Sequence, residues 1–187
     1  MHTIGPAKEK DLPSVLKLFR RVNAQLSEEG NLMWSHGYPS PEVFQEDIAN
    51  HRLYLVKEGT RVLAMGAVSH DITDDFFSQS RSQKKTQDVL DLIGWKGEPI
   101  CLLHRFMSDP AFWGKGVAAE LWDYLERRYK GSTWVFAAYC RNEKALAFYR
   151  KHGFTVHGIY RDFEWGEDSV QILISKKYQK DGLCLNR

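Results

Sequence analysis

Two glycines and a lysine lie where a predicted strand gives way to a predicted helix. The segment reads DPAFWGKGVAA over residues 109–119. Free N–H groups at the start of a helix, together with the positive end of its dipole, favour an anion. Glycine lets the backbone approach a phosphate closely because it has no Cβ. The segment therefore predicts a phosphate site, although a plain strand-to-helix turn would account for the same residues.

Two common phosphate motifs fit this segment poorly. A Walker-type loop needs glycine where Asp109 stands and Ser or Thr where Gly116 stands, so it is excluded. A Rossmann fingerprint fits literally as Gly114-x-Gly116-x-x-Ala119. However, residues 109–113 separate these glycines from the strand, and the next predicted strand ends without the acidic residue that binds ribose. An apparent hairpin among the first strands also opposes a doubly wound fold.

The elements that must position this segment follow from hydrophobic periodicity and turn residues. The first helix is predicted to begin at Asp11, which is the expected N-cap, and the second at Ser40-Pro41. Further helices are predicted at residues 116–130 and 142–152, and a short one at 86–93, ending at Gly94. Strands are predicted at residues 53–57, 62–69, 100–108, 133–139, 154–160 and 169–175.

Two segments together carry a resemblance to a known family. The segment that follows the predicted strand at residues 100–108 resembles the coenzyme A pyrophosphate loop of the GCN5-related N-acetyltransferases (GNAT family). It contains Asp-Pro, an aromatic residue and Gly-x-Gly-Val-Ala, and a helix follows. The family pattern is Gln/Arg-x-x-Gly-x-Gly/Ala, and Trp113 stands at its first position. Downstream, Asn142-x-x-Ala-x-x-Phe-Tyr149-x-x-x-Gly153-Phe is similar to the second family signature. Without the resemblance, an N-cap role for Asn142 and helix packing for Tyr149 remain open.

The resemblance covers nearly the whole chain and implies an α/β fold. The expected order is one strand, two helices, three strands, a helix, a strand, a helix and two strands. The sheet is expected to be mixed, mostly antiparallel, splayed between the fourth and fifth strands and flanked by helices. Residues 1–187 are expected to form a single acetyltransferase domain, with residues 71–99 inserted between the third and fourth strands and residues 176–187 as a basic tail.

The resemblance also implies acetyl-CoA as co-substrate. The pyrophosphate is expected on the N–H groups at the glycines, and the pantetheine arm is expected to pair like an extra strand with the fourth strand. A backbone N–H of that strand is the expected oxyanion donor. The cofactor-binding residues are then Phe106, Met107, Ser108, Gly114, Lys115, Gly116, Val117, Ala118, Ala119 and Asn142.

Tyr149 is the predicted general acid. A phenol with an ordinary pKa of about 10 is protonated at neutral pH and can supply the proton that a thiolate leaving group needs. Some family members use a glutamate as base on the fifth strand, but Ala137 stands at that position. His104 is the nearby group with a suitable ordinary pKa, of about 6.5. A structural histidine, a water relay and an amine that arrives neutral remain alternatives.

The acceptor amine is expected from the opposite side of the sheet. Four aromatic residues could line that side, namely Trp34, Tyr38, Phe163 and Trp165, and three carboxylates could attract a cation, namely Glu164, Glu167 and Asp168. Packing and ordinary solvation account for these residues equally well, so neither set identifies the substrate.

Composition limits the other possibilities. The chain has 187 residues, 43% of them hydrophobic and 27% charged, as expected for one globular domain. No apolar stretch approaches the roughly 20 residues of a membrane span, and the N-terminus lacks a secretory pattern. Three cysteines without metal-type spacing favour a reducing compartment, the cytoplasm, and no metal site. A net charge of +2 argues against a nucleic-acid partner.

The sequence thus predicts an N-acetyltransferase that moves an acetyl group from acetyl-CoA to a primary amine by direct attack in a ternary complex. The amine could belong to a small molecule, a peptide or a protein, and a homodimer is a common default. A non-catalytic acyl-CoA-binding or sensing module is the alternative, favoured by Trp113 and by the missing glutamate. A dinucleotide-binding oxidoreductase is a third possibility.

Overall fold

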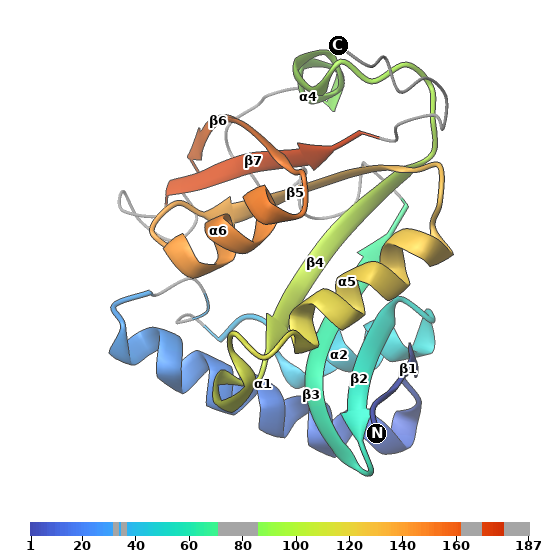
Figure 1. Cartoon of the computed structure of the whole chain (residues 1–187), viewed down its shortest axis with the longest axis vertical. Coiled ribbons are helices and arrows are strands. Elements are labelled where there is room, and N and C mark those ends of the chain that lie inside the picture. Colours follow the sequence, from blue (N-terminus) through green and yellow to red (C-terminus); the bar gives the residue numbers. More distant parts are fainter. Residues whose placement is uncertain (32–33, 35–36, 71–85, 162–169, 178–187) are drawn as a thin grey trace.

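A computed structural model of the protein describes residues 1–31, 34, 37–70, 86–161 and 170–177. Its elements, in chain order, are β1 (Thr3–Pro6), α1 (Leu12–Glu28), α2 (Pro41–Ala49), β2 (Leu53–Glu58), β3 (Arg61–Ser69), α4 (Thr86–Ile93), β4 (Ile100–Ser108), α5 (Val117–Arg128), β5 (Thr133–Tyr139), α6 (Glu143–Lys151), β6 (Thr155–Arg161) and β7 (Val170–Lys176) (Figure 1). The strands and helices predicted with both ends from the sequence agree with these to within two residues.

The strands form one seven-stranded sheet in the order β1-β2-β3-β4-β5-β7-β6. Every neighbouring pair is antiparallel except β4 and β5, which are parallel. This mostly antiparallel sheet confirms the predicted fold class. It also departs from the doubly wound parallel sheet that the Rossmann alternative requires.

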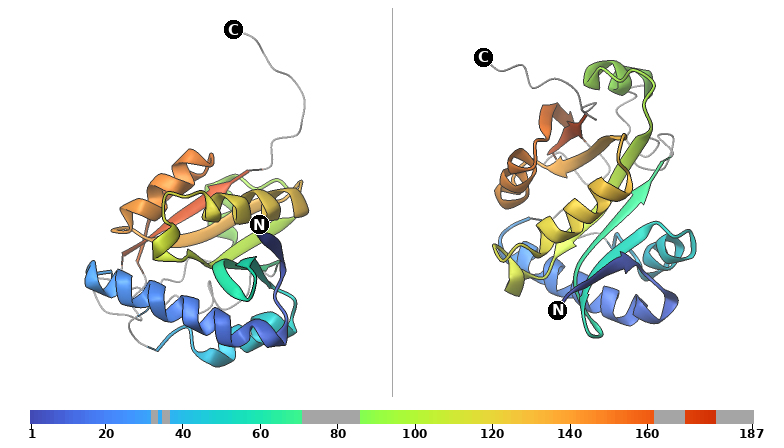
Figure 2. Two further views of the ribbon diagram at one scale, coloured as in Figure 1. Left: turned by 60° about the horizontal axis from the view of Figure 1, so that its bottom comes forward. Right: turned by 45° about the vertical axis from the view of Figure 1, so that its right-hand side comes forward.

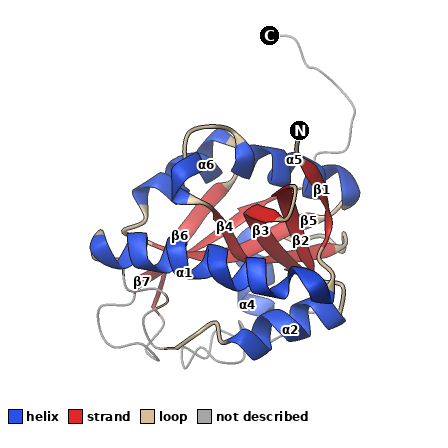
Figure 3. Cartoon of the chain, turned by 90° about the horizontal axis from the view of Figure 1, so that it is seen from below, coloured by secondary structure: helices blue, strands red, loops and turns tan. Residues whose placement is uncertain are grey.

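Helices cover both faces of the sheet. Helices α1 and α2 lie on one face and α5 and α6 on the other, as the views in Figure 2 and Figure 3 show. The first layer packs Leu18 and Phe44 against Leu55 and Met65 of the sheet. The second layer packs residues of α5 and α6 against the other face of the sheet, which includes side chains of β5 and β7. Alternation of side chains along each strand supplies both cores.

The predicted helix in the 71–99 insertion is present as α4. It packs Val89 and Ile93 against Leu102 of β4 and Val135 of β5. Gly94 then ends the helix with a φ of 61°, a conformation that favours glycine. The remainder of the insertion, residues 71–85, lies outside the described residues.

Asp11 occupies the N-cap position of α1, as predicted, but its side chain does not cap that helix. A 3₁₀ turn, Glu9–Asp11, precedes α1, and the carboxylate of Asp11 accepts from the N–H of Lys8 and the ammonium of Lys57, both at 3.0 Å. It therefore caps the 3₁₀ turn and makes no cap bond to α1. Likewise, Ser40 occupies the N-cap position of α2, but its side chain makes no hydrogen bond to the helix backbone.

Among the described residues, no helix has the length and apolarity to cross a membrane.

Candidate active site

The sheet opens where its two halves diverge. β4 and β5 pair only at Ile100–Leu102 and Thr133–Val135, and beyond this contact the strands separate (Figure 1). Residues 103–108 of β4 and 136–139 of β5 border a cleft of about 660 Å³, together with the start of α5 and one face of α6. This volume falls within the range of ligand pockets.

The glycine loop lies at one end of the cleft. Gly114 and Gly116 have φ angles of 75° and 86°, so both need the left-handed conformation that glycine adopts without strain. The first hydrogen bond of α5 runs from the N–H of Glu120 to the carbonyl of Gly116. The N–H groups of residues 117–119 therefore have no acceptor within the helix. These are the N–H groups at which the sequence predicts an anion.

Asp109, which directly follows β4, anchors the glycine loop. Its buried carboxylate accepts from the N–H of Ala111 at 3.1 Å and lies within 2.9 Å of the guanidinium groups of Arg21 and Arg61. The N–H of Asp109 donates to the carbonyl of Leu63 on β3 at 2.8 Å. Because main-chain groups alternate in direction along a strand, this bond turns the main-chain groups of the preceding residue, Ser108, toward the cleft.

Tyr149 reaches the cleft from α6. Its side chain is buried among aromatic rings, with the ring centroids of Phe136, Phe148 and Phe106 at 4.6, 5.6 and 6.5 Å. Burial raises the pKa of its phenol, because a low dielectric disfavours the phenolate. Within the described part of the chain no hydrogen-bond partner occupies its hydroxyl. Tyr149 therefore keeps its proton at neutral pH.

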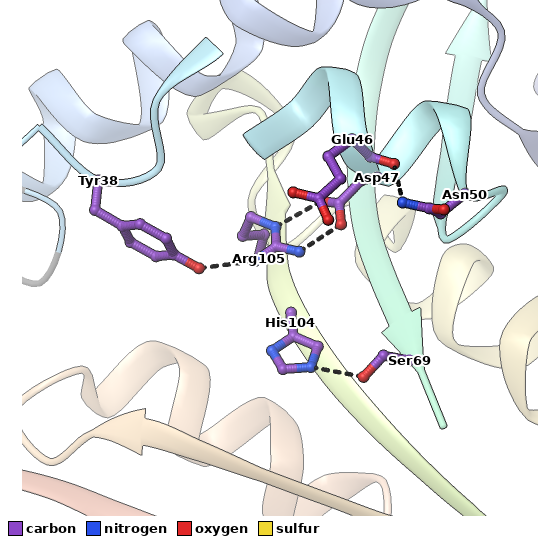
Figure 4. A network of polar contacts seen from close by, with 7 residues as sticks. All are labelled: Tyr38, Glu46, Asp47, Asn50, Ser69, His104 and Arg105. Atoms are coloured by element: carbon purple, nitrogen blue, oxygen red, sulfur yellow. Dashed lines mark hydrogen bonds and ion pairs between the residues drawn. The ribbon is translucent and has the colours of Figure 1, made fainter. Parts of the chain in front are cut away.

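His104 lies on β4 at the other end of the cleft. Its Nε2 is 3.2 Å from the Oγ of Ser69 on β3 (Figure 4). The imidazole is thus held in place by the neighbouring strand and at the same time borders the cleft.

Comparison with known proteins agrees with this geometry. Residues 23–154 match the Acetyltransferase (GNAT) family. The chain belongs to the GNAT family. A GNAT acetyltransferase from Streptococcus agalactiae has a similar solved structure, with 18% identity and a TM-score of 0.75 over 96% of each chain.

Two further structures share this GNAT fold. The ribosomal-protein-S18-alanine N-acetyltransferase from Escherichia coli is 16% identical, with a TM-score of 0.64 over 100% of both chains. The PaiA N-acetyltransferase from Thermoplasma acidophilum, solved in complex with coenzyme A, is 14% identical, with a TM-score of 0.64 over 95% of this chain and 99% of that one. At such identities the likeness concerns the fold. A search of curated protein sequences gives no match.

The cleft gathers nearly all the site residues predicted from the sequence. It is lined by Tyr149, His104, Phe106, Met107, Ser108, Gly114, Gly116, Val117, Ala118, Ala119 and Asn142. Lys115 is the exception. Its ammonium lies 5.4 Å from the ring centroid of Phe112, and its N–H donates to the carbonyl of the same residue at 3.1 Å. Lys115 therefore turns both groups toward Phe112.

Asn142 is the N-cap of α6. Its Oδ1 accepts from the N–H of Ala145 at 3.1 Å, so the capping role left open by the sequence is present in the structure. Ala137, at the position where some GNAT members have a glutamate, also borders the cleft and offers no ionisable group.

Trp113 replaces the usual Gln or Arg of the GNAT loop and makes polar contacts of its own. Its indole Nε1 donates to the carbonyl of Ser108 at 3.0 Å. The ammonium of Lys144, on α6, lies 4.4 Å from its ring centroid, and Lys144 is also paired with Glu29 at 2.6 Å. Trp113 thus joins the loop to β4 and to α6.

Sequence reasoning missed an ion pair at the His104 end of the cleft. Asp47 of α2 is 3% exposed and accepts from Nε and Nη2 of Arg105 at 2.7 and 2.6 Å. The remaining guanidinium nitrogen donates to the hydroxyl of Tyr38 at 2.8 Å (Figure 4). One signal was available, since Asp47 follows Phe44 by three residues and therefore shares the buried face of α2.

The acceptor side is described in part. Trp34 is buried and borders the cleft, and Tyr38 borders it from the segment between α1 and α2. The other residues predicted for this side, Phe163, Glu164, Trp165, Glu167 and Asp168, lie outside the described residues.

Within the described ranges, no group of three or more His, Cys, Asp or Glu side chains could hold a metal ion.

Proposed function

We propose that this protein is an N-acetyltransferase that transfers the acetyl group of acetyl-CoA to a primary amine by direct attack in a ternary complex. The observation that carries the proposal is the cleft itself, which brings the start of α5, the edge of β4 beyond its pairing with β5 and the buried Tyr149 into one cavity. Membership of the GNAT family and the coenzyme A bound to the PaiA N-acetyltransferase support it.

The donor would bind largely through main-chain groups. Its pyrophosphate would accept from the N–H groups at Gly116 and residues 117–119, where the glycine conformation lets the backbone approach a phosphate. Its pantetheine arm would run along the open edge of β4 at Phe106, Met107 and Ser108. Beyond Leu102, β5 no longer pairs with that edge, although the carbonyl of Ser108 already accepts from the indole of Trp113.

The transfer needs an oxyanion donor and a source of one proton. The amine nitrogen would attack the thioester carbonyl, and the developing oxyanion would be stabilised by a main-chain N–H of β4. As the tetrahedral intermediate collapses, the C–S bond breaks and the phenol of Tyr149 gives its proton to the departing thiolate. The phenolate is then reprotonated from solvent before the next turnover.

The amine must attack in its neutral form, and three routes could provide that form. His104 borders the cleft and is the ionisable group that the sequence nominates for this step. A water relay and an amine that binds in its neutral form would serve equally. The proton that the amine nitrogen loses as the amide forms then leaves to His104, to water or to the phenolate of Tyr149. A pH–rate profile separates these, because removal of His104 as base would abolish the acidic limb of the profile.

The acceptor is a primary amine on a small molecule or on a peptide or protein. The S18-alanine N-acetyltransferase among the structural neighbours acts on a protein, as its name states. The cytoplasm is the proposed location, since the three cysteines lack the pattern of a disulfide framework and suit a reducing compartment.

A non-catalytic acyl-CoA-binding module is the second candidate. Trp113 in the loop and Ala137 on β5 favour it, because two polar groups used by other GNAT members are replaced. The first experiment therefore compares acetyl-CoA, NAD and NADP in a thermal-shift assay, followed by acetylation of a panel of amines and peptides. We expect a rise in Tm with acetyl-CoA alone and acetylation of at least one amine. Binding without any acetylation would favour the second candidate.

Replacement of the general acid tests the mechanism. Tyr149→Phe keeps the aromatic packing but removes the proton, so kcat is expected to fall about 100-fold while the Kd for acetyl-CoA changes little. Steady-state kinetics and calorimetry measure the two quantities. Tyr124→Phe, on α5 and outside the cleft, is the control with unchanged kcat. An unchanged kcat in Tyr149→Phe would refute the assignment.

A further inference from the structure

Strand β4 contains a bulge at the point where it enters the cleft. His104 pairs with Ala67 and Met107 pairs with Met65, so two residues of β4, Arg105 and Phe106, face the single residue Gly66 of β3. A bulge of this kind inserts one extra residue and re-aims the side chains that follow. Here it places Phe106 against the α6 layer and Met107 in the α1 layer.

The first residue of the bulge adopts a conformation that its type disfavours. Arg105 has a φ of 49°, in the left-handed region where glycine is the usual residue at this position of a bulge. A side chain with a Cβ is strained there, and such strain persists only where surrounding contacts hold it. Contacts of the arginine side chain must therefore help to keep the bulge.

Those contacts come chiefly from Asp47. Both of its oxygens accept from the guanidinium of Arg105, at 2.6 and 2.7 Å. The side chains of Asp47 and Arg105 are only 5% and 11% exposed, so water cannot readily replace either partner. Helix α2 is anchored to the sheet by Phe44 and Ile48, on the same face as Asp47. The carboxylate is therefore held at a fixed place relative to β4.

The second residue of the bulge touches the proposed chemistry. The ring of Phe106 packs 5.6 Å from that of Phe148 and 6.5 Å from that of Tyr149, measured between centroids. It also lies over Gly66, where an added Cβ would come within 2.9 Å of its Cδ2. The peptide unit between Arg105 and Phe106 carries the N–H of Phe106, on the stretch of β4 that borders the cleft.

We propose that Asp47 is a positioning residue. By pairing with the guanidinium of Arg105, it keeps the β4 bulge in place and so directs the main-chain N–H of Phe106 toward the thioester carbonyl. The proposal rests on the proposed acetyl transfer for its catalytic consequence. Its structural part, that Asp47 fixes the bulge, is independent of which amine is acetylated. In this proposal Asp47, which also lines the cleft, acts through Arg105.

Four variants test it. Asp47→Asn removes the charge and keeps the shape. Arg105→Gly supplies the residue that adopts a positive φ without strain, so the bulge no longer needs the contact with Asp47 to hold its conformation. The double variant combines the two. Asp11→Asn is the matched control, because Asp11 is likewise buried and paired with a cation, Lys57 at 3.0 Å, and lies outside the cleft.

The expected pattern separates positioning from general stability. Asp47→Asn should lower kcat about 10- to 100-fold, leave the Kd for acetyl-CoA within about threefold, and shift the amide resonance of Phe106 in a ¹⁵N-correlated spectrum. Asp11→Asn should lower Tm and leave kcat and that resonance unchanged. In the Arg105→Gly background, Asp47→Asn should have no further effect on kcat.

Two results would overturn the proposal. One is a Phe106 resonance in Asp47→Asn that matches the wild type. The other is a loss of kcat on Asp47→Asn that is as large in the Arg105→Gly background as in the wild type. If the wild type binds acetyl-CoA but acetylates no amine, the proposed function fails, and the resonance of Phe106 still decides whether Asp47 holds the bulge.

Discussion

At the scale of single residues, Trp113 shows how a departure from a family pattern can be accommodated. The indole N–H donates to the carbonyl of Ser108, and the ring faces the ammonium of Lys144. A glutamine or arginine at this position would offer other donors but no aromatic face. Trp113 therefore ties the glycine loop to β4 by one directional bond and to α6 by a cation–π contact.

Trp113→Phe separates these two contributions. Phenylalanine keeps an aromatic face for Lys144 and loses the hydrogen bond, so the free energy of unfolding should fall by about 1 kcal/mol. Trp113→Ala loses both contacts and should cost more. Chemical denaturation measures each value. Trp95→Phe is the control, because its indole donates to the carbonyl of Glu98 at an exposed site, and its effect should be smaller.

At the scale of elements, helix α5 has a different task at each end. Gly116 precedes its first turn with a φ of 86°, and Gly131 follows its last turn with a φ of 96°. An added Cβ would have no neighbour within 4 Å at either position. The two glycines thus carry the same conformational requirement, but only Gly116 lies at the cleft.

Alanine at these two positions separates stability from ligand binding. Gly116→Ala and Gly131→Ala should each lower the free energy of unfolding by about 1–2 kcal/mol, because a Cβ disfavours the left-handed conformation. Only Gly116→Ala should weaken acetyl-CoA binding, since it disturbs the N–H groups that would face the pyrophosphate. Denaturation and calorimetry give the two readouts. Equal loss of affinity in both variants would mean that the loop conformation is not what binds the donor.

At the scale of the whole molecule, Asp109 joins elements that are distant in the sequence. Its carboxylate pairs with Arg21 of α1 and Arg61 of β3, and the residue lies between β4 and the glycine loop. Burial by itself would raise the pKa of Asp109, but the hydrogen bonds from Arg61 and Ala111 and the two guanidinium charges lower it overall. The ionised carboxylate is thus the form that the fold stabilises.

The lowered pKa of Asp109 determines the direction in which the free energy of unfolding changes with pH. The stabilisation is complete above the unfolded pKa of about 3.9 and is lost as the pH falls toward the lower folded value. Asp109→Asn should cost about 2 kcal/mol at pH 7, and its difference from the wild type should shrink below about pH 4. Denaturant titrations at several pH values measure this. A difference that stays constant down to pH 2.5 would contradict the assignment.

The sequence by itself determined the order of the elements and much of the cleft. Alternating and helical periodicities depend on local chemistry, and so does the need for glycine at 114 and 116, because each reflects the conformation of a few adjacent residues. For the same reason α4 could be placed inside an irregular stretch from its apolar spacing and Gly94 alone. Tyr149 and Asn142 were identified by the resemblance of their helix to the second GNAT signature.

Tertiary structure alone decided what depends on contacts between distant segments. The bulge at Arg105 arises from the register between β3 and β4, and the partner of Arg105 is brought by α2 from 58 positions earlier. Asp109 gains its two arginines in the same way, and the indole of Trp113 meets Lys144 only because α6 packs beside the loop. Such pairings are set by how whole elements pack, and a local pattern of residue types contains no record of that packing.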